Sequence, residues 1–121
     1  MRKGDENPII FVDRPVKEMF VKITAFRVGA ISVVRKNGEL LGLVTDYDIR
    51  KALESDRDVT SLTIREMMNP APAVVFSDER ALDAFETMKR RDKPTAVLPV
   101  VDRNRRVVGM VHLHDLISAG L

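Results

Sequence analysis

The sequence predicts a domain of the α/β class, with mixed α+β character, built from two β-α-β-β-α units. Apolar runs of strand length alternate with helical stripes, and the same order of elements occurs twice along the chain. With 121 residues, 45% of them hydrophobic, the chain is long enough to bury a core. Because each unit alone can bury only one face, we expect the two copies to pack together around a pseudo-twofold axis.

The first copy starts with a β-like run in IIFVDRP, which is followed by apolar residues at helical spacing. That stripe consists of Val16, Met19, Phe20 and Ile23. Two strands are predicted at Ala30–Val34 and Leu40–Thr45, because the Asn37-Gly38 pair between them is a strong hairpin-turn signal. A second helix is predicted in DIRKALES, with Ile49, Ala52 and Leu53 on one side.

The second copy follows a linker whose short helix, IREMM, is predicted to stop near Pro70. It consists of a strand in AVVFSDE, the stripe Ala81, Ala84, Phe85 and Met88, paired strands in AVLPVV and RVVGMVH, and a closing helix in DLISAGL. Gly42 and Gly109 are 67 residues apart, whereas Val16 and Ala81 are 65 apart, so KRRDKPTAV contains two extra residues. We therefore place repeat 1 at 1–57, the linker at 58–68 and repeat 2 at 69–121.

Composition narrows the classes of function. The absence of cysteine excludes a disulfide framework and a thiolate metal site. The longest apolar run, near Ala96–Val101, is interrupted by Pro99 and is too short to span a membrane, and MRKGDENP lacks the apolar stretch of a secretion signal. The chain is also short for an autonomous enzyme. We expect a soluble, cytoplasmic protein with no membrane association.

The segment GLVTDYDI places Thr45 at the end of a strand and Asp48 three residues later, at the start of a helix. One interpretation is a capping box, in which each side chain bonds the other residue's backbone N–H. The alternative is a ligand site, because a helix N-terminus with a threonine hydroxyl favours a phosphate. Asp48 would then accept hydrogen bonds from the vicinal hydroxyls of a ribose or another sugar.

GLVTDYDI resembles the G-x-x-T-x-x-D signature of the CBS (cystathionine-β-synthase-like) domain family, and GMVHLHDL resembles a weaker second copy of it. In that family a tandem forms a regulatory module, often called a Bateman module, that binds nucleotides between its halves and often pairs into dimers. The resemblance implies that Thr45 contacts phosphate and Asp48 contacts ribose, with His112 and Asp115 equivalent in a second site. Arg50 is a further candidate for phosphate contact.

A narrower resemblance concerns the C-terminal tandem of bacterial D-arabinose 5-phosphate isomerases. It rests on MRKGDENP, on LPVVD at Leu98–Asp102 and on the closing GMVHLHDLISAGL. It implies a regulatory, non-catalytic chain that controls an attached or partner isomerase domain, or a stand-alone sensor, with no required cofactor. The ligand candidates are AMP, ADP, ATP and CMP-Kdo, the activated product of the pathway that these isomerases begin.

Metal binding and nucleic-acid binding are the two alternatives to a nucleotide site. His112 and His114 share a strand face beside Asp115, but no further ligand joins them, so we predict no metal site. Nucleic-acid binding could use the basic clusters 89–93 and 103–106, yet the net charge is only +2 and no base-stacking motif is present. Met19, Phe20, Phe85 and Met88 on the helix stripes are assigned to the core in preference to contact with a cofactor. Met67 and Met68 could cover the sheet or a second copy in a homodimer.

Overall fold

The computed structural model describes residues 3–26, 29–89, 97–113 and 117. The first repeat contains η1 (Gly4–Glu6), β1 (Ile9–Phe11), α1 (Val16–Phe26), β2 (Ala30–Val34), β3 (Leu40–Thr45) and α2 (Asp46–Glu54). The connection contains η2 (Val59–Ser61) and α3 (Ile64–Met67). The second repeat contains β4 (Val75–Phe76), α4 (Ala81–Lys89), β5 (Val97–Val101) and β6 (Val107–His112).

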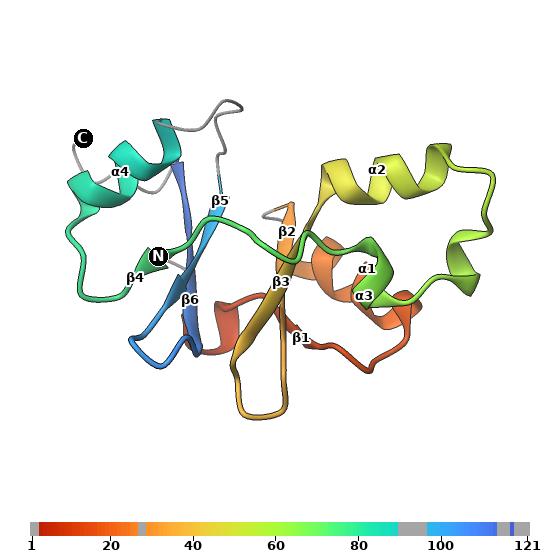
Figure 1. Ribbon diagram of the computed structural model, residues 1–121, viewed down its shortest axis with the longest axis horizontal. Coiled ribbons are helices and arrows are strands. Elements are labelled where there is room, and N and C mark those ends of the chain that lie inside the picture. The colour runs from red at the N-terminus through yellow and green to blue at the C-terminus, as the bar shows by residue number, and fades with distance from the viewer. Residues whose placement is uncertain (1–2, 27–28, 90–96, 114–116, 118–121) are drawn as a thin grey trace.

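Each repeat forms one three-stranded sheet, with the orders β1-β2-β3 and β4-β5-β6. The outer pair β1-β2 is parallel and the hairpin pair β2-β3 is antiparallel, and the second sheet repeats this pattern. The two hairpins lie next to each other in the middle of the molecule, with α1, α2 and α3 at one end and α4 at the other (Figure 1). The predicted duplication and fold class are confirmed.

The helix-facing side of each sheet carries its own core. Alternation along β2 sends Ile31 and Val33 to this side, where they join Met19 and Ile23 of α1. Met67 and Met68 belong to the same buried cluster, so the linker helix covers the sheet of its own chain. In the second repeat Leu98 and Val100 meet α4 through Ala84 and Met88. The predicted core positions of Met19 and Met88 are confirmed, and Phe20 and Phe85 pack partly buried against the two clusters, whereas Ala81 is exposed.

Apolar packing and backbone hydrogen bonds join the repeats. Ala30, Leu43, Val97 and Met110 form a buried cluster with members from both sheets. At the hairpin turns the N–H of Leu40 donates to the carbonyl of Arg105 at 2.9 Å, and the N–H of Val107 donates to Gly38 at 2.9 Å. Since both pairs are related by the 67-residue offset, these bonds form a pseudo-twofold junction between the turns.

The connection between the repeats also closes the outer edge of β3. Leu43 and Asn69 exchange two backbone hydrogen bonds, of 3.0 and 2.8 Å, so Asn69 is paired like a strand residue. A Cβ atom on Gly42 would lie 2.6 Å from Met68 Sδ and 2.7 Å from the Asn69 carbonyl oxygen. The glycine of GLVTDYDI is therefore needed for the close approach of this connection.

Two element boundaries differ from the prediction. α2 begins at Asp46, inside the segment that precedes DIRKALES, because Thr45 is its N-cap. β4 contains only Val75 and Phe76, although a strand was predicted across AVVFSDE. The N–H of Ser32 donates to Pro8 at 2.9 Å, whereas the equivalent Pro99 has no N–H, so the parallel pairing starts one residue later in repeat 2. Most of the predicted closing helix DLISAGL lies outside the described residues.

Candidate ligand-binding site

The junction of β3 and α2 contains the predicted capping box. The Asp48 Oδ2 atom accepts hydrogen bonds from the Thr45 N–H at 2.8 Å and from the Thr45 hydroxyl at 2.9 Å. In return, Thr45 Oγ1 accepts a longer bond of 3.4 Å from the Asp48 N–H. The capping interpretation is confirmed, and both side chains are partly buried. Their contacts with a ligand stay a prediction.

The capping box leaves part of this site available to a ligand. Within the described residues, Asp48 Oδ1 accepts no hydrogen bond, so it can accept one from a sugar hydroxyl while Oδ2 caps the helix. The Thr45 hydroxyl proton is directed at Oδ2, and it must rotate away before it can donate to a phosphate. Arg50 is exposed on the same helix, one turn further on.

The loop before β2 packs against the first turn of α2. The N–H of Asp46 donates to the carbonyl of Gly29 at 3.0 Å. Gly29 has φ +74°, and a Cβ atom there would lie 2.9 Å from Asp46 Oδ2. A glycine is needed at this position both for its backbone conformation and for the room it leaves to the carboxylate. The carboxylate of Asp46 consequently has a defined position at the start of α2.

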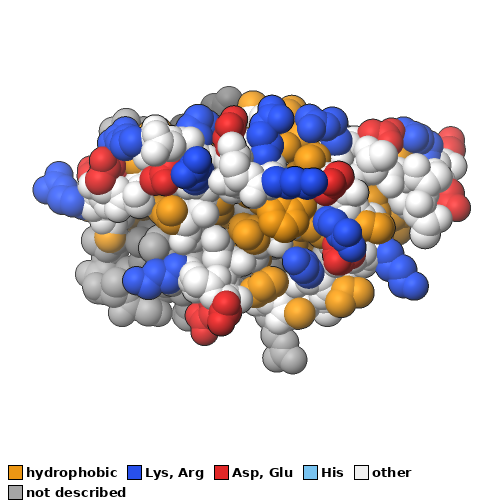
Figure 2. All heavy atoms as spheres, turned by 90° about the horizontal axis from the view of Figure 1, so that it is seen from below, with side chains coloured by type: hydrophobic (Ala, Val, Ile, Leu, Met, Phe, Trp, Pro, Cys, Tyr) orange, Lys and Arg blue, Asp and Glu red, His pale blue; other side chains and the backbone are white. Residues whose placement is uncertain are grey.

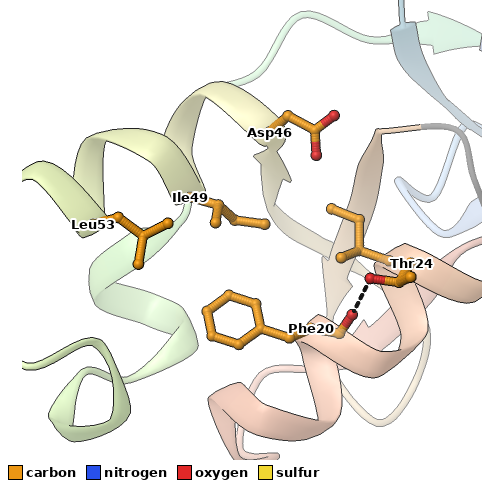
Figure 3. Close-up of a pocket in the computed structure, with 6 residues that line it drawn as sticks. Phe20, Thr24, Asp46, Ile49 and Leu53 are labelled. Atoms are coloured by element: carbon orange, nitrogen blue, oxygen red, sulfur yellow. Dashed lines mark hydrogen bonds between the residues drawn. The ribbon is translucent and has the colours of Figure 1, made fainter.

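A pocket of about 400 Å³ opens between α1 and α2 within the first repeat. Its walls are Phe20, Ile23 and Thr24 from α1 and Asp46, Ile49 and Leu53 from α2. Figure 3 shows the side chains of Phe20, Ile49 and Leu53 directed into the space between the helices, with Asp46 at one end. The pocket does not include Thr45, Asp48 or Arg50, and the predicted cleft between the repeats is a different place.

The chemistry of this pocket does not suit a phosphate. Most of its lining is apolar, and its charged group is the Asp46 carboxylate, which repels anions. The Thr24 hydroxyl donates to the Phe20 carbonyl at 2.9 Å and so offers a ligand an acceptor. Sequence reasoning assigned Phe20 to the core and did not single out Asp46. The sequence signal that could have identified Asp46 is its position directly after the N-cap Thr45, because a carboxylate in the first turn of a helix is stabilised by the helix dipole.

The corresponding site of repeat 2 is only partly described. His112 pairs with Val97 at the end of β6, as Thr45 pairs with Ala30, so the predicted equivalence of His112 and Thr45 holds in the strand register. Asp115 and His114 lie outside the described residues. Across the described part of the chain, no three His, Asp or Glu side chains come together as metal ligands. The absence of a metal site stays a prediction.

The basic clusters are partly engaged within the chain. Arg103 forms a two-pronged ion pair with Asp78, with N···O distances of 2.9 and 2.8 Å. This hydrogen bonding lowers the pKa of the Asp78 carboxyl and raises the pKa of Arg103. Lys89 lies over the ring of Phe85, 5.3 Å from its centre. Positions 90–96, which hold the rest of the first cluster, are outside the described residues.

Two equivalent three-stranded sheets, joined through their hairpins, define a tandem-repeat module. The chain belongs to the CBS domain family, whose model matches residues 1–55 and 64–121. As a CBS pair it is a regulatory module and not a catalytic one, as the sequence predicts. The whole chain is 33% identical to the arabinose 5-phosphate isomerase KdsD of Francisella tularensis and 31% identical to that of Pseudomonas aeruginosa, and it covers 36% of each.

Among solved structures, CBSX2 of Arabidopsis thaliana in complex with AMP superimposes with a TM-score of 0.82 at 22% identity, over 98% of this chain and 90% of that one. A CBS domain pair of protein MJ0100 in complex with 5′-methylthioadenosine and S-adenosyl-L-methionine gives 0.79 at 27% identity, over 95% and 92%. These matches confirm the fold. None of the helices that the structure describes is both long and apolar enough to cross a membrane.

Proposed function

We propose that this module binds an adenine nucleotide or a sugar nucleotide between its repeats and thereby controls an attached or partner enzyme domain. The observation that carries the proposal is the N-terminus of α2, where Asp48 uses Oδ2 in the capping box and keeps Oδ1 for a sugar hydroxyl. Complexes of similar CBS pairs with AMP and with S-adenosyl-L-methionine support the adenosine class.

The site test is isothermal titration of the chain with AMP, ADP, ATP and CMP-Kdo. We expect saturable binding of at least one ligand, and Asp48→Ala should weaken it by about 1.5 to 3 kcal/mol because a charge-assisted hydrogen bond is lost. Glu66→Ala is the matched control, since Glu66 closes an equivalent capping box with Thr63 at the start of α3. Equal affinity of both variants would leave Asp48 as a helix cap.

The same titration separates the ligand classes. Binding of adenine nucleotides without CMP-Kdo would make the module a sensor of adenosine compounds, and the reverse result would indicate feedback by a sugar nucleotide. A short DNA duplex at two salt concentrations belongs in the same series, because salt-sensitive DNA binding alone would contradict the proposal. His112→Thr should strengthen phosphate binding if the second repeat also has a working site.

We propose that the regulated domain is a sugar-phosphate isomerase. The support is that this chain covers about a third of its isomerase relatives, whose remaining length is available for a catalytic domain. Regulation requires that the ligand has unequal affinity for two arrangements of the module. Isomerase activity of the parent protein should therefore change on addition of the ligand, and Asp48→Ala should abolish the change while leaving the basal rate intact.

A homodimer of modules is proposed to form through the helices of the first repeat. Val21 on α1 and Leu53 on α2 are 64% and 63% exposed, and Leu53 also lines the pocket between these helices. Burial of these side chains by a second copy would remove apolar surface from water. Sedimentation equilibrium should detect a dimer, and Leu53→Arg should shift it toward monomer. Arg65→Leu, an exposed change on α3, is the control.

A further inference from the structure

One side-chain arrangement occurs in both repeats at equivalent positions. Phe76 and Asp78 of repeat 2 follow Phe11 and Asp13 of repeat 1 by 65 residues, and Arg103 follows Lys36 by 67. Equivalent backbone hydrogen bonds run from the Val12 N–H to Val34 and from the Ser77 N–H to Val101. Phe11 pairs with Val34 in the same register in which Phe76 pairs with Val101. Each repeat therefore places an aromatic ring, a carboxylate and a cation on one corner of its sheet.

In repeat 2 the three side chains form a closed unit. The guanidinium of Arg103 lies over the Phe76 ring, 4.1 Å from its centre, and forms the two-pronged pair with Asp78. The planar guanidinium can stack on a ring and bind a carboxylate with two N–H groups at once. Arg103 covers part of the Phe76 ring, which is half-buried, whereas the ring of Phe11 is exposed.

In repeat 1 the same three side chains are open. Phe11 is 41% exposed, and Asp13 and Lys36 are exposed. Across the described residues no cation lies over the Phe11 ring, and neither Asp13 nor Lys36 forms an ion pair. The adjacent Arg14 is instead held by Glu18 at 2.6 Å. A lysine ammonium is a hydrated point charge without a plane to stack, so Lys36 does not replace the arginine.

We propose that Phe11 and Asp13 form a docking site for an arginine side chain of a protein partner. The second repeat shows which group fits such a corner, because the ring and carboxylate there are occupied by a guanidinium. Charge complementarity favours the same occupant in repeat 1, where the Asp13 carboxylate forms no ion pair with any residue that the structure describes. On the face seen from below in Figure 2, apolar side chains are interspersed with charged ones.

The site can be tested on the chain as it is with N-acetyl-L-arginine amide as the probe. Citrulline in the same blocked form is the neutral control, because a urea replaces the guanidinium. We expect the arginine probe to shift the backbone amide resonances of Phe11, Asp13 and Lys36 with millimolar affinity, and citrulline to leave them unchanged. Phe11→Ala and Asp13→Asn should each weaken the binding by about threefold or more.

Two exchanges between the repeats sharpen the test. Lys36→Arg should close the corner from within and abolish binding of the probe at Phe11. Arg103→Lys should open the second corner, so that the probe shifts the resonances of Phe76 and Asp78 as well. The inference is overturned if the wild-type chain does not respond to the arginine probe, if citrulline acts equally, or if either exchange leaves the response as it was.

Discussion

The two repeats share topology, register and turn geometry, yet they differ at three positions that decide how each sheet is held. Repeat 1 has Ser32 in its central strand and Gly38 in its hairpin turn, where repeat 2 has Pro99 and Arg105. The corner beside the first strand is open at Phe11 and closed at Phe76 by Arg103. The shared fold thus tolerates unequal side chains and, at Pro99, the loss of one backbone hydrogen bond.

Each of these differences has an energetic cost. Ser32 keeps the bond to Pro8 that Pro99 cannot make, but its hydroxyl is buried without a partner within the described part of the chain. Gly38 has φ +90° and Arg105 has φ +62°, so only the second turn contains a side chain in the left-handed region. Each repeat therefore contains a different unfavourable feature, an unpaired buried hydroxyl in repeat 1 and a non-glycine residue at positive φ in repeat 2. Exchanging residues between the repeats measures the free energy that each feature costs.

The largest effect is expected from Gly42→Ala, which overpacks the edge where the connection crosses β3. The added methyl group meets the Asn69 carbonyl as well as Met68, and a backbone atom cannot move aside cheaply. The free energy of unfolding should fall by about 1 to 3 kcal/mol, measured in urea. The double variant with Met68→Ala should lose less free energy of unfolding than the sum of the losses in the two single variants. An unchanged urea midpoint for Gly42→Ala would show that the connection is loosely held.

Ser32→Pro is expected to have the second largest effect on stability, because it introduces the proline of repeat 2 at a position where the N–H group of repeat 1 is hydrogen-bonded. It removes the donor to Pro8 and leaves that carbonyl unpaired, so the loss should be about 1 to 2 kcal/mol. Hydrogen exchange should become faster in β1. Pro99→Ser is the reciprocal change, and it should lengthen the pairing of β4 and β5. Equal exchange rates in the wild type and Ser32→Pro would refute this explanation of the short β4.

Arg105→Gly should stabilise the protein by up to about 1 kcal/mol, because glycine adopts positive φ without steric cost and the gain exceeds its entropic loss only slightly. At the equivalent position of the first turn, Gly38→Ala should lower the free energy of unfolding by a similar amount, because it places a side chain at positive φ. Thermal or urea unfolding measures both. Arg106→Gly controls for removal of charge at the same turn. If the control stabilises as much as Arg105→Gly, charge and not backbone conformation is responsible.

The smallest effect concerns the exposed pair of Arg103 and Asp78. Because the pair lowers the pKa of Asp78, its stabilisation is present above the ordinary pKa of an aspartate and is lost as the pH falls through the lowered value. Arg103→Ala should raise the pKa of Asp78 toward its ordinary range, measured by carboxyl carbon resonances. The Asp13 carboxyl, in the open corner, is the internal control. An unchanged pKa of Asp78 would mean that the pair does not persist in solution.

The sequence predicted the strands best where both ends are marked. β2 and β3 agree with the prediction to the residue, because Asn37-Gly38 marks the turn and Thr45 the helix start. β4 was predicted too long, since apolar residues alone do not reveal that the strand opposite contains a proline. The pocket was not predicted, because it depends on the approach of α1 and α2, which are separate in the chain. The predicted role of Asp48 as a helix cap is confirmed, and its ligand role awaits titration.

The junction between the hairpins is made of main-chain atoms. Leu40 and Val107 donate through their N–H groups, and Arg105 and Gly38 accept through their carbonyl oxygens. Substitutions at these turns therefore leave the hydrogen-bonding groups of the junction in place, as long as the residue can adopt the turn conformation. The surface at the hairpin tips is thus free to change its charge and shape to suit a partner, while the relative placement of the two repeats is preserved.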